Sequence, residues 1–273
     1  MKIRERFAAL AEAPDARLDL EEGAILIAAE EYPELDEAGV RAELDRLGTE
    51  AATRIASQSD PDARVEALHA YLFDEEGFAG AEAYYDPRNS YLNDVLTRRI
   101  GIPITLALVY MSVGRRARLD LRGISFPGHF LVRAAVGEDR YLDAFHGRTL
   151  EMGEIETRLA ATLGANVALR PEIHLRDATS REILVRMLTN LQQIFAQTGD
   201  VDRLLSCCDR ILLLTPHNPV ALRDRALVYQ SLGWFAAAVS DLESALEWAP
   251  EGELSLSLST RRDALRSRMG PVH

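Results

Sequence analysis

Apolar side chains recur at helical spacing along the first part of the chain, over residues 18–29, 40–47 and 65–72. The second stretch lies directly before Gly48, and Asp60-Pro61 predicts the start of the third helix. A longer and more strongly apolar run covers residues 104–117 and predicts a buried helix. Pro103 suits the first turn of that helix, because a missing N–H group costs nothing there.

After residue 120 the pattern changes to that of strands. The runs LRGISF, HFLVRAAV and RYLDAF are short and rich in β-forming residues, and they are separated by Pro127-Gly128 and by Gly137-Glu138-Asp139. This pattern predicts a series of antiparallel strands, with His129 on one strand and Asp143 on the next. Since helices come first and strands follow, we expect an α+β domain.

The last third of the chain repeats itself with a period of 34 residues. Aligning 185–216 with 219–250 brings two glycines and two prolines into register, Gly199 with Gly233 and Pro216 with Pro250. An apolar-faced helix, a turn, a second helix and a proline make up each unit, which is the pattern of tetratricopeptide repeats. Two units are fewer than such arrays usually need, so we expect them to dock on the preceding domain, with a capping helix over 254–269. Such repeats predict a protein or peptide partner.

Charge and hydropathy exclude two classes of partner. The formal net charge of −12 over 273 residues argues against nucleic acid, because phosphate contacts need a basic face. No apolar run approaches the roughly 20 residues that cross a bilayer, and the N-terminus lacks the apolar stretch of a signal peptide. We therefore expect a cytoplasmic protein with neither a membrane nor a nucleic acid as partner.

Cys207 and Cys208 are the only cysteines, and they are neighbours in the sequence. This spacing suits neither a redox pair nor a pair of zinc ligands, and without a disulfide framework a reducing compartment is the default. Cys208 falls on the second helix of a repeat, where a free cysteine behaves as a small hydrophobic residue. We expect it to be a packing residue.

The residues with chemical potential lie between Asn89 and His146. In a cysteine–histidine–aspartate hydrolase the nucleophile sits at a helix N-terminus, the histidine holds its proton and the aspartate fixes the tautomer of the histidine. Here a helix begins at Pro103, and His129 and Asp143 lie on successive predicted strands, so their side chains could form a hydrogen bond. Asp143 and His146 also have the character of metal ligands, but two ligands do not make a site, and we expect no metal and no cofactor.

The run NSYLNDVLTRRIGIPITLALVYMSVGRRA, followed by GISFPGHFLVR and YLDAFHGRTL, resembles the bacterial SirB-like family. That resemblance implies a transglutaminase-like (papain-like) α+β domain followed by tetratricopeptide repeats, and it is best from about Tyr84 to Leu150. It also implies a regulatory role for the family. The wider superfamily uses a cysteine, a histidine and an aspartate; His129 and Asp143 match the last two.

The position of the superfamily's cysteine falls at Pro103, and Thr105 is the nearest hydroxyl. The resemblance therefore predicts a non-catalytic binding, scaffold or regulatory protein that keeps a His–Asp cleft without thiol chemistry. The alternative is a hydrolase or transferase that uses His129 and Asp143 with water or Thr105 as the nucleophile. We expect a helical N-terminal region over 1–60, a transglutaminase-like domain over 61–178 and the repeats over 179–273.

Overall fold

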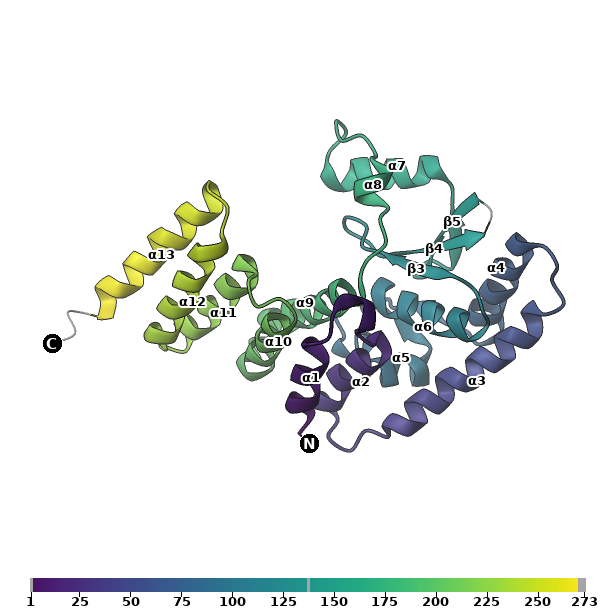
Figure 1. Ribbon diagram of the computed structural model, residues 1–273, viewed down its shortest axis with the longest axis horizontal. Coiled ribbons are helices and arrows are strands. Elements are labelled where there is room, and N and C mark those ends of the chain that lie inside the picture. The colour runs from purple at the N-terminus through teal and green to yellow at the C-terminus, as the bar shows by residue number, and fades with distance from the viewer. Residues whose placement is uncertain (1, 137, 270–273) are drawn as a thin grey trace. The chain divides into compact units, whose positions relative to one another are not determined.

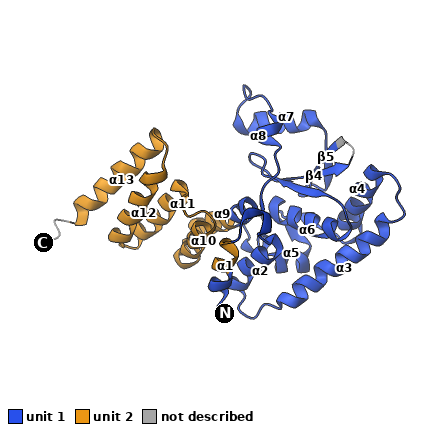
Figure 2. Cartoon of the chain, in the orientation of Figure 1, with its two compact units in different colours: residues 1–6, 13–187 blue, residues 7–12, 188–273 orange. Residues whose placement is uncertain are grey.

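The computed structural model describes residues 2–136 and 138–269 (Figure 1). The chain forms two compact units (Figure 2). The first comprises residues 1–6 and 13–187, and the second comprises residues 7–12 and 188–273. Among the described residues, no helix is both long enough and apolar enough to span a membrane.

Helices dominate the first 116 residues, as their apolar spacing predicts. In chain order they are α1 (Ile3–Ala11), α2 (Leu20–Glu31), α3 (Glu37–Ile55), α4 (Pro61–Ala70), α5 (Leu92–Arg98) and α6 (Pro103–Arg116). Aspartates cap three of them: the side chains of Asp19, Asp36 and Asp60 accept hydrogen bonds from backbone N–H groups in the first turns of α2, α3 and α4. Such caps satisfy donors that have no partner within the helix.

Helix α3 continues through Gly48 to Ile55, beyond the apolar stretch read from the sequence. The glycine serves packing here, not helix termination. A Cβ atom at Gly48 would lie 2.4 Å from Cβ of Arg116 on α6, so only glycine allows the two helices to approach this closely. Helix α6 is buried along nearly all of its length, with Pro103 in its first turn, which confirms the predicted central helix.

The strands after residue 120 form an antiparallel sheet in the order β3-β4-β5-β6. Their bounds are β3 (Leu121–Ile124), β4 (Leu131–Val136), β5 (Glu138–Asp143) and β6 (Arg148–Leu150). The predicted antiparallel series is confirmed, although Glu138 and Asp139 belong to β5, and Gly137 of the predicted turn lies outside the described residues. A separate pair of short parallel strands joins β1 (Ala79–Gly80) to β2 (Ile100–Gly101).

Two helices that the sequence pattern did not predict follow the sheet, α7 (Met152–Leu163) and α8 (Pro171–His174). The sheet lies between α7 on one side and α6 on the other (Figure 1). Ile155 and Leu159 of α7 pack in one buried cluster with Leu131 and Tyr141 of the sheet. This packing presents one face of β5 to α7, and the C-terminal residue of β5 is Asp143.

The remaining helices are α9 (Ser180–Thr198), α10 (Val201–Leu214), α11 (Pro219–Ser231), α12 (Phe235–Trp248) and α13 (Glu253–Met269). The predicted pair of helical hairpins is therefore confirmed, and a further helix, α13, covers the range of the expected capping helix. Gly199 and Gly233 occupy the same place in successive hairpins and have φ angles of 72° and 75°. Residues other than glycine are strained at such angles, which explains why glycine recurs 34 positions later.

Candidate functional site

Asp143 is the centre of the candidate site in the first unit. Its side chain is fully buried at the end of β5. Oδ1 accepts hydrogen bonds from Nε2 of His129 at 2.8 Å and from the backbone N–H groups of Phe145 and His146. Oδ2 accepts from Nδ1 of His146 at 2.7 Å and forms an ion pair with Arg158 of α7 at 2.9 Å. A buried carboxylate with this many donors is held in one orientation.

Two opposing effects set the charge of Asp143. Burial alone would raise the pKa of its carboxyl group, but the hydrogen bonds and positive character of His129 and His146 outweigh it and lower the pKa below the usual range. The side chain is therefore an anion at neutral pH. An ionised carboxylate only accepts hydrogen bonds, so His129 carries its proton on Nε2.

His129 was predicted on a strand, and that prediction is wrong in detail. The residue lies in the turn between β3 and β4, two residues before Leu131, where its backbone N–H donates to the carbonyl of Phe126 at 3.1 Å. The turn still directs the imidazole onto Asp143, so the predicted hydrogen bond is present. Within the described part of the chain, Nδ1 of His129 has no hydrogen-bond partner. This nitrogen is the one free to meet a ligand.

Thr105 is buried in the first turn of α6. Its Oγ1 lies 2.7 Å from the carbonyl of Asn89 and 3.1 Å from both the backbone N and the carbonyl of Ile102. The hydroxyl therefore caps the helix and ties the 87–89 loop to it. Over residues 2–136 and 138–269, no hydrogen bond joins Thr105 to His129 or Asp143. The structure brings His129 and Asp143 together and leaves Thr105 in a structural contact.

A turn over residues 144–147 packs against the candidate site. His69 holds it by bonding the carbonyl of Gly147 at 2.8 Å through Nε2 and the hydroxyl of Tyr110 through Nδ1. Phe145, in the same turn, meets the ring of His129 edge to face at 6.3 Å between centroids, and Tyr84 meets Phe145 in the same manner. Tyr84 therefore packs on the aromatic ring that lies beside His129.

His129, Asp143 and His146 also form a group with metal-ligating atoms, all within 4.8 Å of one another. Three such atoms are more than the sequence indicated. However, the guanidinium of Arg158 already lies on Oδ2 of Asp143, and a second cation at that oxygen would be repelled. Both imidazoles also direct a nitrogen at the carboxylate itself. The arrangement suits a hydrogen-bonded His–Asp pair better than a metal centre.

Two residues of the site were not predicted in their observed roles, Arg158 and His146. His146 was considered only as a metal ligand, and Arg158 was not considered at all. A signal for Arg158 existed: Ile155 and Leu159 stand four residues apart and Gly164 follows, which is the pattern of a short amphipathic helix. Arg158 is next to Leu159 on that helix, and Leu159 faces the sheet.

Neither cysteine belongs to the first unit. Cys207 and Cys208 are buried on α10 in the second unit, and Gln192 donates a hydrogen bond to the sulfur of Cys208 at 3.3 Å. Burial raises the pKa of Cys208 to about 12, so its thiol is protonated at neutral pH. The prediction that Cys208 is a packing residue agrees with this burial.

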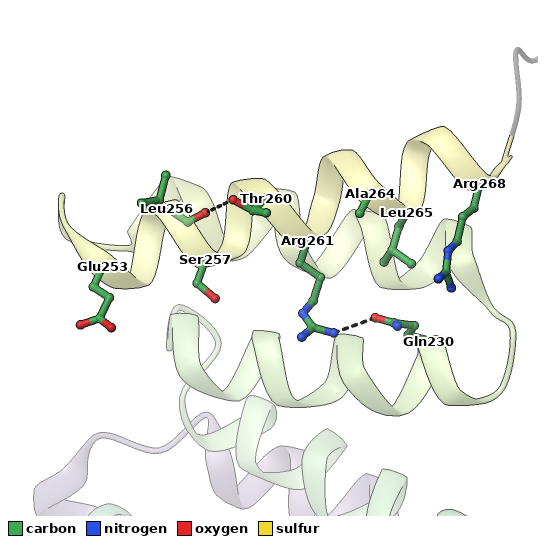
Figure 3. Close-up of a pocket in the computed structure, with 9 residues that line it drawn as sticks. All are labelled: Gln230, Glu253, Leu256, Ser257, Thr260, Arg261, Ala264, Leu265 and Arg268. Carbon is green, nitrogen blue, oxygen red and sulfur yellow. Dashed lines mark hydrogen bonds between the residues drawn. The ribbon is translucent and has the colours of Figure 1, made fainter.

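The second unit carries a surface groove of about 480 Å³ between α11 and α13. Figure 3 shows Gln230 of α11 facing Arg261 of α13, and a hydrogen bond of 3.0 Å joins them across the groove. Arg268, Ser257 and Glu253 line the same groove from α13. The lining is mainly apolar, with Leu256, Ala264 and Leu265, and charged groups stand among these side chains. Such a mixed surface is suited to a peptide with both apolar and charged side chains.

Two protein-family models match successive parts of the chain. The family model described as the transglutaminase-like superfamily matches residues 38–189, and that of the tetratricopeptide repeat matches residues 191–269. The chain therefore belongs to the transglutaminase-like superfamily and, within it, to the family of the UPF0162 proteins and SirB1.

Relatives match most of this chain and most of their own length. A UPF0162 protein of Xylella fastidiosa is 41% identical over 250 residues, which are 88% of each chain. A UPF0162 protein of Vibrio cholerae is 32% identical over 91% of this chain and 93% of its own. The protein SirB1 of Salmonella typhimurium is 26% identical over 85% of this chain and 87% of its own. No solved structure matches the chain.

Proposed function

We propose that this protein is a non-catalytic binding and regulatory protein, a pseudoenzyme that keeps the His–Asp cleft of its superfamily without a nucleophile. The observation that carries the proposal is the start of α6. Pro103 has neither a nucleophilic atom nor a free N–H to serve as an oxyanion donor, and the hydroxyl of Thr105 is engaged in the helix cap.

His129 and Asp143 then act as binding residues. Asp143 fixes the orientation and tautomer of His129, and Nδ1 of His129 offers a hydrogen-bond acceptor to a ligand in the cleft. The 13% exposure of the His129 side chain is enough for contact with a small group but keeps the ring in place. A fixed, partly exposed imidazole beside aromatic rings is a good recognition element even when no bond is broken.

The repeats supply the second half of the proposed function. Tetratricopeptide-type hairpins present their first helices along one surface, and the groove lies between α11, the first helix of the second hairpin, and the helix α13 that follows the hairpins. We assign a protein or peptide partner to this region. We divide the chain into a helical region over 1–60, a transglutaminase-like domain over 61–178 and repeats over 179–273. Two buried cysteines that form no disulfide suit a reducing compartment, and we place the protein in the cytoplasm.

A second candidate is a hydrolase that activates water. The observation that favours it is the free Nδ1 of His129, because a neutral imidazole nitrogen backed by an aspartate is a general base. Without an attacking residue, such an enzyme would have to position the water molecule itself.

Comparing the wild-type protein with His129→Ala separates the two candidates. We expect peptide and ester hydrolysis at the rate of the buffer alone in both proteins. The hydrolase is favoured instead if the wild type hydrolyses a substrate and His129→Ala slows it by about a hundredfold or more, the usual contribution of a general base. Arg122→Gln, an exposed change on β3, is the control variant.

A further inference from the structure

Arg186 of α9 lies beside the His129 turn and belongs to the first unit. Its Nη1 donates to Oγ of Ser125 at 3.0 Å and approaches the carbonyl of Phe126 at 3.3 Å. Its guanidinium stands 5.9 Å from the centroid of the Phe130 ring. Among residues 2–136 and 138–269, no carboxylate forms an ion pair with Arg186.

Arg186 differs in this respect from the arginines of neighbouring elements. Arg133 on β4 pairs with Asp139 and Asp177, and Arg158 on α7 pairs with Asp143. The chain has 43 acidic residues against 31 lysines and arginines, so partners are abundant. Burial also lowers the pKa of Arg186, opposed only by the nearby Tyr84. A guanidinium that is partly desolvated and unpaired has unused capacity for an anion.

The surroundings of Arg186 connect directly to His129. The carbonyl of Phe126 accepts from the backbone N–H of His129 and is also the neighbour of Nη1 of Arg186. On the other side, Tyr84 interacts electrostatically with Arg186 and meets Phe145, and Phe145 meets the His129 ring. Arg186 and Phe145 thus approach the His129 turn from two elements, and Tyr84 packs on Phe145.

Two further donors face no acceptor in the part of the chain that the structure describes. Ser125 is exposed and accepts from Arg186, which leaves its own hydroxyl proton unused. Tyr84 is 40% exposed, and its hydroxyl makes no hydrogen bond to another described residue. Together with the guanidinium, these hydroxyls provide three donor groups on the elements that surround the His129 turn.

We propose that Arg186, with Ser125 and Tyr84, binds a carboxylate group of the ligand that occupies the His129 cleft. The single cation favours a carboxylate, which carries one negative charge, over a phosphate, which carries nearly two; Arg158 is not available as a second cation because it neutralises Asp143. Arg186 is then the residue that selects the ligand, and the aromatic rings of Tyr84 and Phe145 cover the ligand's apolar part. This inference rests on the proposed binding role and names the ligand's charged group.

Acetate is the probe, titrated into the full-length protein at constant ionic strength and followed by NMR of the Arg186 Nε–Hε group and the His129 ring. We expect a saturable shift of both signals. Arg186→Gln should weaken acetate binding by about tenfold or more, as loss of a charge-assisted hydrogen bond requires. Arg186→Lys should retain part of the affinity because the charge remains. Arg122→Gln, which removes a guanidinium already paired with Asp120, should bind like the wild type.

Three results would overturn the inference. The wild type could show no saturable shift, Arg186→Gln could bind acetate as well as the wild type, or inorganic phosphate could bind more than tenfold more tightly than acetate. The wild-type titration and Arg186→Lys decide the matter even if Arg186→Gln fails to fold. Hydrolytic activity in the wild type would count against the non-catalytic proposal alone and would leave the acetate result standing.

Discussion

At the scale of single residues, the side chains of the candidate site are held in place by their contacts with Asp143. Two imidazoles and two backbone N–H groups donate hydrogen bonds to one buried carboxylate, and the guanidinium of Arg158 forms an ion pair with it. Removing the charge would leave Arg158 without its partner and set an amide N–H₂ group against donors. The site residue with the largest effect on stability should therefore be this aspartate, not the histidine that faces the ligand.

Asp143→Asn should lower the free energy of unfolding by about 3 kcal/mol at pH 7. The variant removes the negative partner of a buried ion pair and leaves the positive charge of Arg158 without compensation. Urea unfolding measures this change. Asp139→Asn on the same strand is the matched control: its side chain is 42% exposed, and losing its contact with Arg133 should cost less than about 1 kcal/mol.

The effect of Asp143→Asn should also depend on pH. The pKa of Asp143 is lower in the folded chain than in the unfolded one, so the stability it contributes is fully present above the unfolded value of about 3.9 and is lost as the pH falls below it. The difference between wild type and variant should shrink in that acidic range. A difference that stays constant from pH 7 to pH 3 would contradict the assignment.

Thr105→Val tests the structural role of the other candidate residue. The variant leaves the N–H of Ile102 and the carbonyl of Asn89 without a partner in a buried place, so we expect a loss of about 2 kcal/mol in the free energy of unfolding. Thr105→Ser keeps the hydroxyl and should lose less than half as much. Equal stability of Thr105→Val and the wild type would show that the cap contributes nothing.

At this scale the sequence predicted the His129–Asp143 pair but not its surroundings. Fourteen residues separate the two, and His129 lies only two residues before β4, so the expectation of adjacent strands still paired the right side chains. Arg158 and Arg186 come from helices that follow the strands at no fixed spacing. Their approach depends on how α7 and α9 pack against other elements, which a pattern along the chain does not contain.

At the scale of elements, the close approach of β1 to the 144–147 turn positions the ring of Phe145. A Cβ atom at Gly80 would lie 2.5 Å from the carbonyl oxygen of Phe145 and 2.8 Å from its ring. A backbone oxygen cannot move aside as the end of a flexible side chain can. Glycine at this position therefore allows the turn to sit under the His–Asp pair.

Gly80→Ala should destabilise the protein by about 2 kcal/mol, the usual cost of overpacking, and should shift the NMR signals of His129. Gly153→Ala on α7 is the control, because no atom lies within 4 Å of a Cβ placed there, and it should not lower the stability. Thermal unfolding compares the two. If both variants melt with the wild type, the turn is not held by this contact.

Helices with a regular apolar spacing were predictable at the scale of elements, and α6 is the best example. Helix α3 was predicted too short, because Gly48 resembles a helix end in the sequence but serves the contact with Arg116 in the structure. The placement of His129 failed for a related reason. Strand-forming residues such as Phe130 begin before the hydrogen-bonded ladder does, so composition extended β4 by two residues.

At the scale of the whole molecule, the chain combines a transglutaminase-like domain with tetratricopeptide repeats. The only thiols of the chain lie in the repeats, buried, whereas the His–Asp pair lies in the first domain. Residue patterns and the family resemblance were sufficient to predict both folds, and the sequence shows that no cysteine precedes Cys207. The groove between α11 and α13 and the donors around Arg186 depend on tertiary packing, and no sequence pattern pointed to them.

The central claim is that the domain has the frame of a thiol enzyme without its chemistry. The most direct test is amine incorporation and peptide hydrolysis by the purified full-length protein, with and without a thiol-alkylating agent. We predict no turnover above the buffer in either case, because Pro103 offers no nucleophile and the thiol of Cys208 is buried and protonated. Robust turnover that alkylation abolishes, and that the double variant Cys207→Ser and Cys208→Ser lacks, would contradict the account.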